Sequence, residues 1–270
     1  MPCAGDVVAV RETTYTLTLL GSWGLRVDGE ALHLHLREQR VLALLGLRGD
    51  QSRTVLAGLL WPDSPEARAR ASLRTSLMRI RQRLGAPISV RRDDVGLSAG
   101  FTVDVATLRS TLDRIEDDGR EVAEDPAPAL QILREPDLLV GWYDDWVLAE
   151  RERLRHRRVR ALETLALASL DAGRAPESIS FAEEAAKLEP LLESAVTLHV
   201  RALLHDGDLT AALTEYRAFR QRLDAELGVS PPRALTHLLR EAKAQRLTVG
   251  DASAVGILPG IAPVRHGRDP

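Results

Sequence analysis

The spacing of apolar residues changes along the N-terminal part of the chain. On both sides of Asp28-Gly29 apolar residues alternate with polar ones, which is the pattern of two strands joined by a tight hairpin turn. With residues 15–20 before it, this hairpin predicts an N-terminal three-stranded sheet. From Val41 onward the apolar residues recur every three or four positions, which predicts helices. We expect two short helices, the second capped by Ser52 and ending near residues 61–63.

A third, longer helix has the clearest boundary signals. Ser64 can serve as the N-cap, Pro65 suits the first helical position, and Gly85 can adopt the left-handed conformation that ends a helix, so the helix should run from about Pro65 to Leu84. On a helical wheel one narrow stripe is apolar and should be buried: Ala69, Leu73, Leu77, Ile80 and Leu84. The opposite face and its flanks carry arginines and small polar residues: Arg68, Ser72, Arg74, Thr75, Arg79, Arg81 and Gln82.

Extended segments follow the third helix. Residues 88–97 predict a β-hairpin with Asp93-Asp94 at its turn and with Arg91 and Arg92 close to its tip, and residues 101–103 continue in an extended pattern. A sheet, three helices and a hairpin in this order are the elements of a winged helix-turn-helix. In that fold one helix enters the major groove of DNA and the hairpin, or wing, contacts the flanking backbone.

From residue 104 the alternating pattern gives way to successive amphipathic helices. Gly173 and Gly207 are 34 residues apart, the period of a tetratricopeptide helix pair, and a small residue follows each glycine five positions later, Ser178 and Ala212. From Thr248 the chain lacks periodicity, which predicts a disordered tail. The expected helices cover residues 104–116, 128–134, 142–170, 176–189, 191–205, 209–227 and 231–247.

The pattern therefore predicts two folded domains and a tail. An α+β winged helix-turn-helix is expected over residues 1–103, an all-α tetratricopeptide-like domain over residues 104–247, and the tail over residues 248–270. We expect the first domain to fold alone and to bind DNA weakly, and the helical domain to add affinity by pairing protomers.

Composition narrows the possible classes of protein. No apolar run approaches the length of a membrane span, and the N-terminus lacks the basic and apolar regions of a signal peptide. Cys3 is the only cysteine, which excludes a disulfide framework and multi-cysteine metal sites. We therefore expect a cytoplasmic, nucleoid-associated protein with no cofactor, no bound metal and no membrane partner.

The net charge of −3 divides unevenly along the chain. Residues 1–103 carry 14 arginines against 10 acidic residues, whereas residues 104–270 carry 22 basic against 29 acidic residues. Between Arg68 and Arg92 there are arginines but no carboxylate. A run of like charges in a sequence usually forms a solvated helix face. On the outer face of a groove-binding helix, however, such arginines attract phosphates, and Arg, Gln, Ser and Thr can read base edges.

Two groups of residues resemble a known family in its domain order. Residues 60–63 and 71–85 are similar to the OmpR-type winged helix of the Streptomyces antibiotic regulatory proteins. Residues 142–147, 150–154 and 216–231 are similar to the bacterial transcriptional activator domain, which follows the winged helix in that family. The resemblance implies a transcriptional activator without catalytic activity. It also implies that protomers bind promoter direct repeats as a homodimer, at least on DNA, and recruit RNA polymerase with its sigma subunit. In the family the controlled genes often direct antibiotic or other secondary-metabolite production.

The turn at Trp61, Pro62, Asp63 and Ser64 lies beside the groove helix and is the expected polymerase contact.

The expected DNA contacts divide by position on the helical wheel and the wing. Phosphate contacts are expected from Arg74, Arg81, Arg91 and Arg92. Groove contacts are expected from Arg68, Ser72, Thr75, Arg79 and Gln82.

Other interpretations of the sequence remain open. The chain could instead be a tetratricopeptide-type adaptor for proteins, or a signal-sensing regulator without direct base readout. Residues 96–100 match the G-x-S-x-G nucleophile elbow of esterases around Ser98, but an elbow requires a helix directly after the serine, and a strand is expected there.

Two further features have an ordinary structural interpretation. The arginine run over residues 151–160 is expected to form a solvated, ion-paired surface, with contact to DNA or polymerase as the alternative. Trp142, Tyr143 and Trp146 are expected to be core anchors rather than a ligand cage.

Overall fold

The computed structural model describes residues 13–254, with side chains described as far as residue 246. The chain divides into two units, the first ending at Leu165 and the second beginning at Ala166, so the division falls inside helix α6 (Asp145–Asp171). Among the described helices, none combines the length and apolar character that crossing a membrane requires.

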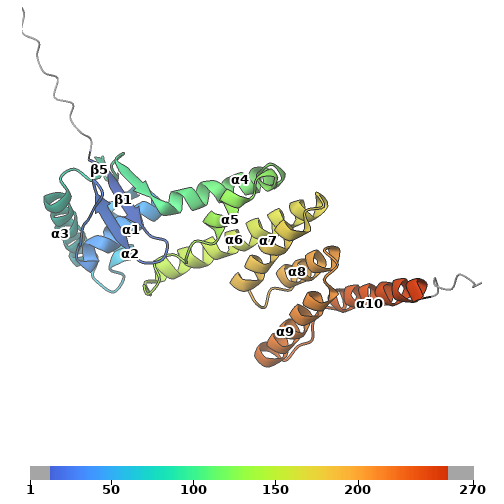
Figure 1. Cartoon of the computed structure of the whole chain (residues 1–270). Coiled ribbons are helices and arrows are strands. Elements are labelled where there is room, and N and C mark those ends of the chain that lie inside the picture. Colours follow the sequence, from blue (N-terminus) through green and yellow to red (C-terminus); the bar gives the residue numbers. More distant parts are fainter. Residues whose placement is uncertain (1–12, 255–270) are drawn as a thin grey trace, which may run out of the picture. The chain divides into compact units, whose positions relative to one another are not determined.

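The N-terminal sheet contains the three predicted strands and a fourth (Figure 1). The turn between the second and third strands has positive φ at Asp28 (49°) and Gly29 (87°), as a tight hairpin requires. The fourth strand returns from beyond the wing and pairs in parallel with the first, and the ring of Tyr15 stacks on that of Phe101 at 4.6 Å. In sheet order the strands are β3 (Glu30–Ala31), β2 (Gly24–Val27), β1 (Tyr15–Thr18) and β7 (Phe101–Val103).

Three helices follow the hairpin as expected. The side chain of Ser52 accepts a hydrogen bond from the Val55 amide, which confirms the predicted cap of the second helix. The predicted apolar stripe of the third helix is buried throughout and packs against the first two helices. The helices are α1 (Leu36–Arg48), α2 (Arg53–Leu60) and α3 (Glu66–Leu84).

The start of α3 differs from the sequence prediction. Pro65, not Ser64, is the N-cap, and its carbonyl accepts from the amides of Arg68 and Ala69 at 2.9 and 3.0 Å. The Ser64 amide donates to Trp61 O at 3.1 Å, so Ser64 belongs to the preceding turn. The predicted stop is confirmed, because Gly85 has φ 77° and its amide donates to Arg81 O.

The wing is a hairpin of β5 (Ile88–Arg91) and β6 (Asp94–Leu97), with Arg92 at positive φ in the turn. A short strand, β4 (Gln51–Ser52), pairs with β6 and makes this a three-stranded sheet. After the wing, Ser98 leads through a turn into β7 rather than into a helix. The strand–turn–helix context that an esterase elbow needs is therefore missing at Ser98.

The first unit continues beyond residue 103 into α4 (Asp104–Glu124), α5 (Ala127–Leu133) and α6. Helix α4 is longer than the predicted helix, because it continues past a kink at Asp118, where the backbone is not helical. The Asp104 carboxylate accepts the amides of Leu19 and Leu20, each at 2.9 Å. The winged-helix sheet is thus hydrogen-bonded to the start of the helical region.

The loop before α6 is also tied to the sheet. The Leu139 amide donates to Leu19 O at 2.8 Å, the Val140 amide donates to Gly21 O at 2.6 Å, and the Gly21 amide donates to Asp137 O at 2.8 Å. Through these hydrogen bonds the segment after Thr18 pairs with residues 137–140, which lie far along the chain. The winged helix and the first three helices that follow it form one unit.

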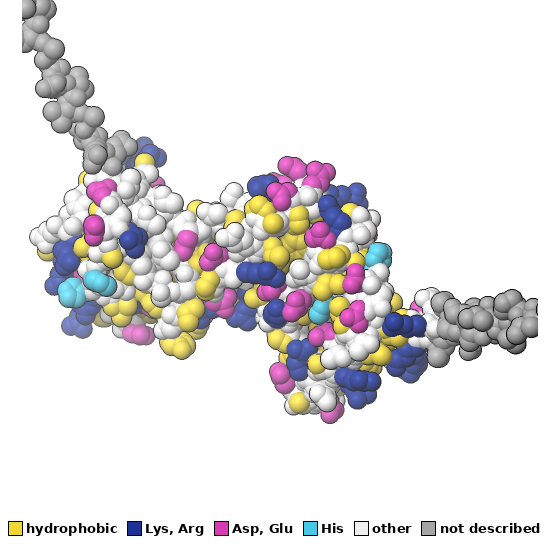
Figure 2. Space-filling model, in the orientation of Figure 1, with side chains coloured by type: hydrophobic (Ala, Val, Ile, Leu, Met, Phe, Trp, Pro, Cys, Tyr) yellow, Lys and Arg dark blue, Asp and Glu magenta, His cyan; other side chains and the backbone are white. Residues whose placement is uncertain are grey.

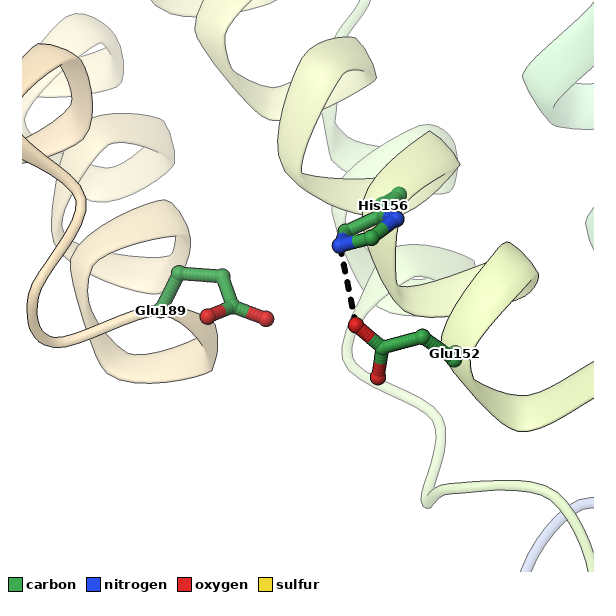
Figure 3. Close-up of side chains that lie close together, drawn as sticks. All are labelled: Glu152, His156 and Glu189. Carbon is green, nitrogen blue, oxygen red and sulfur yellow. Dashed lines mark ion pairs between the residues drawn. The ribbon is translucent and has the colours of Figure 1, made fainter. Parts of the chain in front are cut away.

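Part of the arginine run of α6 is ion-paired, which confirms the ordinary interpretation for those residues. Arg157 pairs with Asp113 at 2.6 Å and with Glu116 at 2.9 Å, and Arg155 pairs with Glu152 at 3.7 Å. Glu152 also lies one helical turn before His156, with 2.9 Å between Oε1 and Nε2 (Figure 3).

Two arginines of this run bind the preceding loop rather than facing solvent. Arg151 donates to three backbone carbonyls of the loop, those of Leu138, Leu139 and Trp142. Arg158, only 2% exposed, donates to the carbonyls of two more loop residues at 2.8 and 3.2 Å and lies 3.8 Å from a carboxylate. Burial lowers the pKa of Arg158. The residues that Arg158 contacts are Glu135, Pro136 and Asp137.

Arg158→Met is expected to destabilise the first unit by about 3 kcal/mol, because it removes a buried guanidinium and leaves two loop carbonyls and the Asp137 carboxylate without their donor. Urea denaturation followed by circular dichroism measures this change. Arg160→Met removes the same charge from an exposed position of the same helix and should stay within about 0.5 kcal/mol of the wild type. Equal stability of the two variants would contradict a structural role for Arg158.

The second unit repeats one backbone pattern at the predicted interval of 34 residues. Gly173 and Gly207 both have positive φ, 73° and 85°, and the small residues Ser178 and Ala212 are both fully buried. The repeated donor–acceptor pairs are Gly173–Leu170 and Gly207–Leu204, Arg174–Ser169 and Asp208–Leu203, and Ser178–Arg174 and Ala212–Asp208. The period is therefore confirmed in the hydrogen bonds as well as in the residue types.

The remaining helices follow the predicted order, and the last one is longer than predicted. The predicted tail begins at Thr248, but its first part, as far as Ala254, is helical. Gly250 lowers helix propensity without ending the helix, and the next proline stands only at Pro259. Residues 255–270 lie outside the described part of the chain. The helices are α7 (Ala175–Leu188), α8 (Glu193–His205), α9 (Leu209–Leu227) and α10 (Arg233–Ala254).

Candidate nucleic-acid interface

The outer face of α3 is basic and exposed. Figure 2 shows dark-blue basic side chains over the part of the surface that α3 forms. Ser72 is half-buried, and the other predicted residues of this face are exposed: Arg68, Arg74, Thr75, Arg79, Arg81 and Gln82. After Glu66 in its first turn, α3 carries no acidic residue. The face thus presents donors that suit phosphate oxygens and base edges.

One flank of α3 forms a hollow with α2. The hollow has a volume of about 370 Å³, and Arg53 at the first position of α2 lies on its rim with Arg74 and Arg81. Arg53 is not among the DNA contacts predicted from the sequence, because the spacing within α3 does not indicate which residues of α2 lie beside it. The other residues of the hollow are Leu77, Met78 and Gln82.

The opposite flank of α3 is held by α1 and the loop before it. Arg79 lies 3.6 Å from the carboxylate of Glu38, which is 2% exposed and whose two oxygens accept no hydrogen bond from any described residue. Arg83 donates to the His33 carbonyl at 3.0 Å. The sequence missed Glu38, because an acidic residue in the first turn of a helix is ordinarily a solvated dipole partner. Arg79 therefore has a structural partner in addition to its predicted role in the groove.

Arg79→Ala is expected to lower stability by roughly 1–2 kcal/mol, because it leaves the buried Glu38 carboxylate without its charged partner. Arg79→Ala combined with Glu38→Gln should recover part of the loss, since the neutral amide needs no cation. Thermal unfolding measures both variants, and Arg68→Ala, exposed on the same helix, is the matched control. If Arg79→Ala unfolds at the same temperature as Arg68→Ala, the pair contributes nothing to stability.

The wing adds two exposed arginines. Arg91 is paired in register with Asp94, and Arg92 occupies the turn with φ 57°. Asp93 at the same turn lies 4.0 Å from Arg53 of α2. The wing tip therefore carries both signs of charge, with the two predicted phosphate-binding arginines on its surface.

The turn between α2 and α3 lines a second hollow, of about 650 Å³, with the residues that precede and begin α6. Pro62 and Asp63 are exposed, and Trp61 and Ser64 are half-buried. Across this hollow lies Tyr143, with 80% of its surface exposed.

The three aromatic residues near the start of α6 differ in burial. Trp146 is buried and Trp142 half-buried, with their rings edge to face at 6.4 Å, so the prediction of core anchors is correct for Trp146. The prediction is wrong for Tyr143, because the ion pair of Arg40 with Asp144 fixes the chain beside α1 and leaves the tyrosine on the outside.

A winged helix with a basic outer helix, followed by paired helices, defines a class of bacterial transcriptional regulators. Comparison with known proteins agrees with this class. Residues 105–243 match the family model described as "Bacterial transcriptional activator domain". The chain belongs to that family.

Two Streptomyces proteins are similar to this chain over most of its length. The chain is 31% identical over 226 residues to "Regulatory protein AfsR" of Streptomyces coelicolor, covering 78% of this chain and 22% of that protein. It is 29% identical over 241 residues to the Streptomyces griseus protein of the same name, covering 82% and 24%. The chain thus spans about a quarter or less of the length of these relatives.

The fold is similar to that of Mycobacterium tuberculosis EmbR, solved in complex with a low affinity phosphopeptide. The TM-score is 0.66 at 21% identity, and the match covers 90% of this chain and 71% of that chain. The predicted fold class, a winged helix followed by a mostly helical domain, is confirmed.

Proposed function

We propose that the chain is a transcriptional activator that binds DNA in a sequence-specific manner through α3. The observation that supports this most strongly is the exposed basic face of α3, which is flanked by the wing arginines and by Arg53 of α2. A helix of this kind fits the major groove, while the wing reaches the neighbouring backbone. Such a protein acts at the nucleoid and needs no catalytic residue.

The contacts divide into two roles. Arginines on the α2-side flank and on the wing neutralise phosphates and fix the helix in the groove. Residues at the centre of the exposed face read base edges, where a bidentate arginine favours guanine and a glutamine favours adenine. The phosphate-binding set is Arg53, Arg74, Arg81, Arg91 and Arg92. The groove-facing set is Arg68, Ser72, Thr75, Arg79 and Gln82.

Activation requires a second contact, to RNA polymerase and its sigma subunit. The turn at Trp61, Pro62, Asp63 and Ser64 leads into the groove helix, and its two exposed residues and adjoining hollow leave room for a protein surface. Protomers would bind direct repeats about one helical turn apart as a homodimer on DNA, because successive turns present the groove on the same side of the duplex. The controlled genes would include those of secondary metabolism.

Selection of bound fragments from the source genome tests the proposal. Enrichment of short direct repeats upstream of genes is the expected outcome, and a reporter fused to such a promoter should respond to the protein. The rival function, a protein adaptor that uses its helical repeats, predicts no enriched sequence and a protein partner recovered through the second unit. The exposed basic face of α3 favours the activator function, since a protein adaptor does not require a DNA-binding surface.

A further inference from the structure

Three arginines from three helices converge on one buried carboxylate, away from the α3 face. Glu150 of α6 is 1% exposed. Its carboxylate accepts from Arg48, at the end of α1, at 3.1 Å and from Arg153, in the next turn of α6, at 3.1 Å. Arg109 of α4 lies 3.6 Å away. All four residues belong to the first unit, so the cluster links the winged helix to the helices that follow it.

The cluster carries more positive charge than Glu150 can balance. Three guanidiniums and one carboxylate leave an excess of two positive charges around a hollow of about 550 Å³. Burial lowers the pKa of Arg109, the positive charges of Arg157 and Arg153 lower it further, and the carboxylates of Glu150 and Asp113 oppose that shift. Arg109 also donates to the Leu47 carbonyl, which holds its guanidinium in place. An uncompensated excess of charge at a partly desolvated position is unfavourable, and a bound anion relieves it.

The geometry suits an anion of a particular kind. A guanidinium has five N–H donors in a planar fork, and Glu150 engages only part of those on Arg48 and Arg153. The remaining donors can pair with a phosphoryl group, for which the arginine fork is well matched. Because Glu150 fixes the guanidiniums in advance, a ligand does not have to order them on binding.

We propose that this hollow is a binding site for a small phosphoryl anion with at least two negative charges, such as a diphosphate group. The ligand would lie among Arg48, Arg109 and Arg153, with Gln51 of β4 at the edge. Since Arg48 ends α1, whereas Arg109 and Arg153 lie on α4 and α6, a bound anion fastens the winged helix to the helical region. Binding therefore stabilises the first unit, independently of contact with DNA.

Calorimetric titration of the full chain with sodium pyrophosphate, at constant ionic strength, tests this site. Saturable binding is expected, and Arg153→Gln should weaken it at least about 10-fold. Arg153 has 65% of its side chain exposed, so this variant should fold, and circular dichroism checks that it does. Arg155→Gln, which removes a neighbouring charge paired with Glu152, is the matched control and should bind as the wild type does.

A second pair of variants separates this site from the DNA-binding face. Arg74→Ala with Arg81→Ala should leave pyrophosphate binding unchanged, and Arg153→Gln should leave DNA affinity unchanged. Absence of saturable binding, or equal pyrophosphate affinity in Arg153→Gln and the wild type, would overturn the proposal. Loss of pyrophosphate binding in the α3 variant would overturn it too, because the anion would then occupy the groove face. A parallel loss of DNA affinity in Arg153→Gln would assign the cluster to the DNA backbone instead.

Discussion

Replacing both Arg74 and Arg81 with alanine is expected to weaken binding to a selected DNA site by roughly 100-fold, about tenfold for each lost charge-assisted contact. Both residues lie on the exposed α2-side flank of α3. Because they are assigned to phosphates, binding to cognate and to scrambled DNA should weaken by the same factor. The slope of log affinity against log salt should fall by about two units. Fluorescence anisotropy with labelled duplexes measures both quantities.

The matched control removes two arginines from the second unit. Arg217→Ala with Arg220→Ala makes the same change in net charge at exposed positions of α9 and should leave DNA affinity within about twofold of the wild type. An equal loss of affinity in the two double variants would mean that overall charge, rather than the α3 face, determines binding.

The second large expected effect is a loss of stability when the chain is cut at the predicted domain boundary, residue 103. A fragment of residues 1–103 is expected to lose cooperative unfolding, whereas a fragment of residues 1–165 should retain it. The shorter fragment lacks the Asp104 carboxylate that binds the Leu19 and Leu20 amides, and it lacks the carbonyl partner of Gly21. At about 1 kcal/mol for each net hydrogen bond, the loss is at least about 3 kcal/mol before any apolar exposure.

Thermal denaturation followed by circular dichroism compares the two fragments directly. Asp104→Asn in the longer fragment is a graded control, because the amide keeps one acceptor oxygen and removes the charge. If residues 1–103 melt cooperatively at the temperature of the longer fragment, the contacts across the boundary are dispensable. The sequence expectation that this domain folds alone would then hold.

Local patterns predicted the elements that depend on near neighbours. The apolar stripe from Ala69 to Leu84 is buried as the helical period requires, and Gly85 ends the helix with the positive φ that favours glycine. The Asp28-Gly29 turn and the 34-residue period follow in the same way from backbone preferences and from spacing.

Features that depend on distant partners were not visible in the sequence. The parallel pairing of β7 with β1 and the antiparallel pairing of β4 with β6 join segments that are separated by a whole helical region. Arg151 and Arg158 have the same side chain as their exposed neighbours, and only the loop packed against α6 distinguishes them. Tyr143 is outside the core because of an ion pair formed by the next residue in the chain.

In the candidate DNA-binding site, too, local patterns predicted some features and distant partners determine the others. The period of α3 predicted which residues are exposed, but the role of each flank depends on the neighbouring helices. Glu38 of α1 holds Arg79 on one flank, and Arg53 of α2 extends the other. Neither residue shares a local motif with α3, so both required the fold.

Titration of the full chain with its best selected DNA site and with a scrambled duplex, across a range of salt concentrations, tests the central claim most directly. Sequence-specific binding through α3 predicts a steep salt dependence for both duplexes and an affinity ratio of at least about 10³ in favour of the selected site. A flat salt dependence with a ratio near one would contradict the claim. The basic face of α3 would then be a solvated surface, and the function would have to lie in the helical repeats.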